Sequence, residues 1–98
     1  MSSAISLVTL IGSTQAEVLR ALWEMGPSGA AEVHRYLQDL RARNKQKPVA
    51  FTTVTTILHR MTEKGLLTKD EESRRYKAVS RQTIEDRMLS ELSDVLDV

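Results

Sequence analysis

The stretch from Phe51 to Gly65 reads Phe-Thr-Thr-Val-Thr-Thr-Ile-Leu-His-Arg-Met-Thr-Glu-Lys-Gly and decides the fold. Its four threonines between positions 52 and 56 are β-branched, which taken alone favours a strand. The apolar residues indicate a helix instead, because they recur at the i, i+3, i+4, i+7 spacing of one helix face: Val54, Ile57, Leu58 and Met61. We therefore expect a helix that Thr52 caps at its N-terminus and Gly65 ends.

The opposite face of this helix carries side chains that fit a DNA groove. A threonine offers a donor, acceptor lone pairs and a methyl group that can pack on thymine, while arginine and histidine can reach a phosphate or a base edge. The alternative is a solvated face whose threonines only cap the helix or bond back to it. The residues of this helix expected to contact DNA are Thr52, Thr55, Thr56, His59 and Arg60.

Positive charge is concentrated around this helix, although the chain of 98 residues has a formal net charge of only +1. Between Leu40 and Thr62 there are five basic residues and no acidic one, whereas from Ser80 onward five acidic residues face two basic ones. Such segregation favours a polyanionic partner on one face, although an ordinary solvated surface is the alternative. Lys45 and Lys47 are therefore added to the predicted DNA-binding residues.

The composition argues against several other classes of protein. The chain has no cysteine, and its two histidines, His34 and His59, fall on separate predicted helices, so neither a disulfide framework nor a metal or other cofactor is expected. We find no glycine-rich phosphate loop, nucleophile elbow or paired carboxylates, so an enzyme is not expected. No apolar run is long enough to span a membrane, and we expect a soluble cytoplasmic protein.

Two further helices are expected before the threonine-rich one. Residues 14–17 match a capping box of Thr and Glu, and a Gly-Pro pair ends this first helix at Met25. Residues 28–30 fit a turn or a one-bridge strand, after which a second helix loses its pattern beyond Ala42. A basic connector follows and is kept extended by Pro48, as expected between the two helices of a helix-turn-helix.

Two short strands are expected after the threonine-rich helix, at residues 66–69 and 75–79, on either side of an acidic turn. Three helices and a hairpin follow the order of a winged helix-turn-helix. The expected fold class is therefore mainly α with a small β-hairpin, in one DNA-binding domain over residues 1–79 that includes an N-terminal arm. Arg74 and Arg75 at the edge of the hairpin are expected to contact DNA, whereas the acidic tip stays away from it.

Residues 80–98 predict a C-terminal amphipathic helix. Its apolar stripe is longer than so small a core needs, so we expect the helix to meet a second copy of the chain. The alternative is that it folds back on the first helix of its own chain. The residues expected at the dimer contact are Ile84, Met88, Leu92, Val95 and Leu96.

In their order and spacing, these segments resemble the penicillinase and methicillin-resistance repressors, a family of winged-helix transcriptional regulators. The resemblance covers about residues 13–79, including the run from 50 to 61; each piece is weak alone, and their order and spacing together are specific. It implies a homodimer that represses transcription from a palindromic, double-stranded DNA operator. The resemblance also implies that Thr52, Thr55 and Thr56 face the major groove and that Arg60 and Arg74 contact the DNA backbone.

The sequence departs from the family pattern at its C-terminal end. Typical members have several helices there, whereas this sequence continues for about one helix, so it is either a fragment or dimerises through that helix alone. Copper-sensing relatives carry cysteines in this region, which this sequence lacks. Members that respond to β-lactams are released by a membrane sensor that triggers proteolysis, and the residues of this sequence do not identify a sensor or protease partner. Two alternative functions are a winged-helix protein-interaction module and a nonspecific DNA-binding protein.

Overall fold

The computed structural model describes residues 12–87 of the chain. In chain order these residues form α2 (Ser13–Met25), α3 (Ala30–Arg43), α4 (Phe51–Glu63), β1 (Leu67–Asp70) and β2 (Arg75–Ala78), followed by a helical segment at residues 81–87. The two strands pair in an antiparallel hairpin. The predicted fold class, mainly α with a small β-hairpin in winged helix-turn-helix order, is therefore confirmed.

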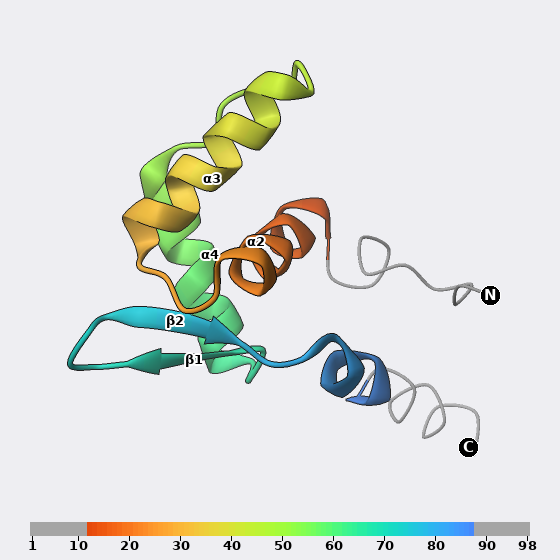
Figure 1. Ribbon diagram of the computed structural model, residues 1–98, viewed down its shortest axis with the longest axis vertical. Coiled ribbons are helices and arrows are strands. Elements are labelled where there is room, and N and C mark those ends of the chain that lie inside the picture. Colours follow the sequence, from red (N-terminus) through yellow and green to blue (C-terminus); the bar gives the residue numbers. More distant parts are fainter. Residues whose placement is uncertain (1–11, 88–98) are drawn as a thin grey trace.

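The helices form one layer and the hairpin lies beneath it (Figure 1). α3 packs on both α2 and α4, while β1 contacts α4 and β2 contacts α2. The turn of the hairpin points to the side of the view opposite the 81–87 segment. No helix in the described part of the chain is both long and apolar enough to cross a membrane.

One hydrophobic core joins all of these elements. The predicted stripe of α4 provides three fully buried side chains, and Ile57 is half-buried at its edge. α2 and α3 contribute their own apolar faces, and the connector, both strands and the last segment add one residue each. The buried core residues are Val18, Leu19, Leu22, Val33, Leu37, Val49, Val54, Leu58, Met61, Leu67, Tyr76 and Ile84.

The C-terminal end of α4 is as the sequence predicts. Gly65 takes a left-handed backbone conformation with φ of 80°, which a glycine adopts without steric cost. Its amide donates to the carbonyl of Thr62 at 3.0 Å, and the amide of Leu66 donates to Met61 at 2.9 Å. These two bonds form a Schellman motif, which satisfies carbonyls left free at the helix end.

The N-terminal caps predicted for α2 and α4 are wrong. α4 begins two residues earlier than expected, with Ala50 in the cap position and Thr52 already inside the helix. α2 begins at Ser13 after Gly12, and no side chain caps it. Thr14 and Glu17, which the sequence assigned to a capping box, instead contact α3.

The hairpin matches its predicted limits to within one residue at each strand end. Ser28 adds a third partner, because its backbone exchanges hydrogen bonds of 3.0 and 2.8 Å with Tyr76 of β2. The predicted one-bridge strand at residues 28–30 is therefore present. This bridge attaches the start of α3 to the hairpin and so fixes the position of the hairpin relative to the helices.

The segment after the hairpin folds back onto its own chain. Ile84 is only 1% exposed and packs in the core, so its predicted place in a dimer contact is wrong, because the winged helix itself covers this side chain. Arg87 donates from Nη1 to the carbonyl of Gly65 at 2.6 Å. The other predicted dimer residues, Met88, Leu92, Val95 and Leu96, lie outside the described residues, as does most of the N-terminal arm.

Candidate nucleic-acid interface

The outer face of α4 is accessible. Of the five predicted contact residues on this helix, Thr55 is half-buried and the others are exposed: Thr52, Thr56, His59 and Arg60. The first turn carries no acidic residue. Since the N-terminal end of a helix has a partial positive charge, this part of α4 suits an anionic partner.

Two threonines of this face bond back to the helix. The hydroxyls of Thr55 and Thr56 each donate to the carbonyl oxygen of Thr52, both at 2.9 Å. The back-bonding that the alternative reading expected is therefore present for this pair, whereas a face that is only solvated remains untested. Such bonds use the hydroxyl proton of each side chain and leave its methyl group and remaining oxygen lone pairs without a partner in the helix. Thr56 is exposed and Thr55 is half-buried, so both side chains still reach the surface.

The sequence reading missed an acidic residue on the same face. Glu63 lies one turn beyond His59, and the ring Nε2 of His59 is 3.6 Å from its carboxylate. Both side chains are largely exposed, so the pair contributes little to stability. Its consequence is for binding, since the carboxylate makes the C-terminal half of α4 less attractive to a phosphate backbone than the N-terminal half. The i+4 spacing from His59 could have revealed it.

The sequence reading also left Phe51 out of the site. This first residue of α4 is 45% exposed, and its ring meets the ring of His34 edge to face, with centroids 5.5 Å apart. Aromatic residues usually lie in a core, and the helical period of the apolar residues would likewise predict that Phe51 is buried. Among the described residues, the aromatic contact of this ring is the one with His34 of α3, and the residue remains exposed.

Two side chains of α3 position the start of α4 by holding the backbone of Val49. The ring Nε2 of His34 donates to the Val49 carbonyl at 2.8 Å, and the Val49 amide donates to Oε1 of Gln38 at 2.9 Å. His34 and Gln38 are four residues apart and therefore project from one face of α3. The connector thus reaches α4 in a fixed position, so the outer face of α4 has a defined direction.

One of the five basic residues counted around α4 is not available to a partner. Arg41 turns inward, where its Nη2 lies 2.9 Å from the carboxylate of Glu17 and 3.2 Å from the hydroxyl of Thr14. Its Nη1 also donates to the carbonyl of Lys47 at 3.2 Å. This cation therefore joins α2, α3 and the connector, and it adds no free charge to the outer face.

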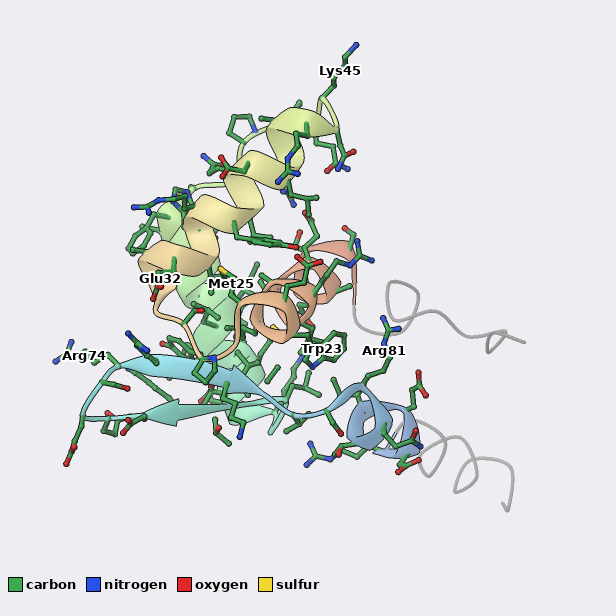
Figure 2. All side chains as sticks on the ribbon, viewed as in Figure 1. Trp23, Met25, Glu32, Lys45, Arg74 and Arg81 are labelled. Carbon is green, nitrogen blue, oxygen red and sulfur yellow. The ribbon has the colours of Figure 1, made fainter. Side chains whose placement is uncertain are left out.

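The two lysines of the connector lie apart from the hairpin. Lys45 and Lys47 are both exposed, and Lys45 has a left-handed φ of 55° in the turn after α3. Figure 2 shows Lys45 at the far end of α3, whereas Arg74 lies at the edge of the hairpin. A duplex that contacts both would therefore have to extend along most of the molecule.

The hairpin turn displays both predicted arginines. Arg74 and Arg75 are exposed, and Arg74 has a left-handed φ of 57° where the turn joins β2. Asp70 closes the turn, since its carboxylate accepts from the Ser73 hydroxyl at 2.8 Å and the Glu72 amide at 3.2 Å. These bonds, that of Ser73 foremost, hold the pKa of Asp70 below its usual value. The carboxylate of Asp70 is therefore directed into the turn.

Comparison with known proteins identifies the chain at this point. A family model described as penicillinase repressor matches residues 11–98, which is nearly the whole sequence. The chain belongs to the penicillinase repressor family. This family consists of DNA-binding transcriptional repressors with a winged helix-turn-helix fold, so the chain is a repressor of this type, and the family is not a class of enzymes. No curated protein and no solved structure matched the chain in the corresponding searches.

Membership in the penicillinase repressor family identifies DNA as the partner of this repressor. The repressor fold brings the N-terminal half of α4 and the hairpin turn to the same side of the view in Figure 1. It does not bring Lys45 close to Arg74. The individual contact residues remain predictions within this repressor fold.

Proposed function

We propose that this repressor binds a palindromic DNA operator specifically as a homodimer, with the N-terminal half of α4 in the major groove and the hairpin on the adjacent backbone. The observation that carries the proposal is the exposed first half of α4, which has no acidic residue in its first turn. In helix-turn-helix proteins, residues near the N-terminus of the recognition helix contact base edges.

Basic residues support this orientation from two sides. Arg60 lies further along α4, and Arg74 lies at the hairpin turn; both are exposed. Arginine is well suited to bind phosphate through its planar guanidinium group. Arg60 and Arg74 are therefore proposed to position the protein on the backbone, while the threonines Thr52, Thr55 and Thr56 contact bases.

The proposal is tested by selecting bound duplexes from a random pool of DNA sequences. The affinity of the protein for the selected duplex and for a scrambled duplex is then measured over a series of salt concentrations. An inverted repeat with half-sites about one helical turn apart is the expected result. Salt-dependent binding without sequence preference would indicate a nonspecific binder instead. Absence of binding even at low salt would indicate that the fold serves protein docking.

Two substitutions test the backbone contacts. Arg60→Ala and Arg74→Ala are each expected to weaken binding to all sequences and to lower the slope of log affinity against log salt by about 0.9, because one phosphate contact is lost. Arg81→Ala is the matched control, since its guanidinium lies over the ring of Trp23, on the other side of the molecule from Arg74 (Figure 2). An unchanged slope in both test variants would refute the phosphate assignment.

A further inference from the structure

The hydrogen bonding of Thr55 and Thr56 limits what these residues can read in a groove. A threonine hydroxyl has a single proton, and each of these hydroxyls is 2.9 Å from the carbonyl oxygen of Thr52, which can only accept. Both protons are therefore used within the helix. What remains for a base is the γ-methyl group of each side chain and the free oxygen lone pairs.

These remaining groups do not suit every base. In the major groove guanine presents two acceptors, N7 and O6, which require a donor on the protein. Back-bonded threonines do not supply one. Thymine instead presents a C5-methyl group, on which a threonine methyl can pack. The bonding on α4 therefore favours apolar contact with thymine over hydrogen bonding with guanine at these positions.

Phe51 extends this apolar character by one helical turn. It lies four residues before Thr55, so the two side chains share one face of α4. The residue is 45% exposed, and the edge-to-face contact of its ring with His34 limits the orientation of the ring. The free part of the ring adds apolar surface at the end of α4 that is nearest to a base edge in the proposed complex.

We propose that Phe51, Thr55 and Thr56 form a surface that recognises the C5-methyl groups of thymine, so that each operator half-site is selected for thymine through its methyl group. The inference rests on the proposed function, because it requires α4 to lie in the major groove. It deepens that function by naming the chemical group that the recognition helix reads.

The test uses the full chain and the duplex obtained by selection. Each thymine of one half-site is replaced in turn by uracil, which pairs identically with adenine but lacks the methyl group. At least one replacement is expected to weaken binding about fourfold, the effect of losing one buried methyl contact. A selected half-site without thymine, or equal affinity for every uracil duplex and the parent, would overturn the inference.

Paired substitutions assign the effect to the protein methyl groups. Thr55→Ser and Thr56→Ser keep the back-bonded hydroxyl and lose the methyl, so the thymine-to-uracil affinity ratio is expected to fall toward one at the contacted base. Thr55→Val and Thr56→Val keep the methyl, and the ratio is expected to persist. Phe51→Ala is expected to reduce the ratio at a neighbouring base. If the serine variants keep the ratio and the valine variants lose it, hydroxyl groups read the base and the inference is wrong.

The experiments distinguish failure of this inference from failure of the proposed function. If selection yields a preferred sequence but uracil has no effect, the inference fails while the proposed function stands. If selection yields no preferred sequence, both fail. Circular dichroism melting of each variant checks that a lost ratio does not result from unfolding.

Discussion

At the scale of single residues, Arg41 links three parts of the helical domain. Its guanidinium group contacts Glu17 and Thr14 of α2 and the backbone of Lys47, and the side chains of the ion pair are only 17% and 15% exposed. A largely buried charge of this kind requires its partner, because removal of one member leaves the other unpaired.

Glu17→Gln tests this dependence with almost no change of shape. The variant is expected to lower the free energy of unfolding by about 1.5–3 kcal/mol, the usual contribution of a hydrogen bond to a charged group. Urea denaturation measures the change. Glu71→Gln in the exposed hairpin turn is the control, with an expected effect within about 0.5 kcal/mol. Equal effects in the two variants would show that the Arg41 pair contributes no more than a surface residue.

At the scale of secondary-structure elements, α4 is defined at both ends by different means. Its start is held from outside by His34 and Gln38, through the backbone of Val49. Its end is fixed by its own sequence, through the left-handed conformation of Gly65. Because the helix end depends on this one glycine, a single added methyl group there is expected to disturb it.

Gly65→Ala is expected to destabilise the domain by about 1 kcal/mol, because alanine at a φ of 80° is strained. An added Cβ would also approach the guanidinium of Arg87 to 3.4 Å. Thermal unfolding measures the effect. Gly29→Ala is the matched control, because that residue has an ordinary φ of −83° and its added Cβ would meet no atom closer than 3.7 Å. A loss of stability in the control that equals the loss at Gly65 would contradict this account.

The hairpin turn is expected to respond to acid through Asp70. The pKa of Asp70 in the folded protein lies below its ordinary value of 3.8, so the stabilisation that it provides is present above that value and is lost as pH falls through the folded pKa. Carbon NMR of the carboxyl group measures the titration. Ser73→Ala removes the main hydrogen bond and is expected to return the pKa toward 3.8, and an unchanged titration would contradict the assigned cause.

The elements differ in how far the sequence predicted them. The end of α4 and the hairpin were predictable, because glycine and the strand pattern act locally. The start of α2 was not, since Arg41, 24 residues away from Glu17, binds the two residues that would otherwise form a capping box. Within the site, the exposed face of α4 followed from periodicity, whereas the exposure of Phe51, an aromatic residue, could not be predicted from the pattern of α4 alone.

At the scale of the whole molecule, the predicted C-terminal helix combines an observed contact within its own chain with a predicted contact to a second copy, which the sequence pattern alone does not separate. Ile84 is part of the same apolar stripe as the later residues of the predicted C-terminal helix, yet it is buried in the core of its own chain. Fold-back on the same chain, the alternative to dimerisation, is therefore correct for the beginning of this helix. The residues from Met88 onward remain the predicted dimer contact.

Two substitutions are expected to separate these two contacts. Ile84→Ala should lower the free energy of unfolding by about 2–5 kcal/mol, as for a large core residue, and leave association unchanged once folded. Leu92→Asp should dissociate the dimer and leave the winged helix folded. Sedimentation velocity and thermal unfolding measure the two properties. A wild-type protein that sediments as a monomer would contradict the predicted dimer contact.

The indole of Trp23 makes the attachment of the last segment visible to spectroscopy. Its Nε1 donates to the carbonyl of Val79 at 2.8 Å, the guanidinium of Arg81 lies 5.2 Å from its ring centre, and the chain contains no other tryptophan. Detachment of the segment would remove both contacts and expose the indole to water. The intrinsic fluorescence of the unlabelled protein would then shift to longer wavelength, and one optical signal would report whether the C-terminal region is docked while the repressor binds or releases DNA.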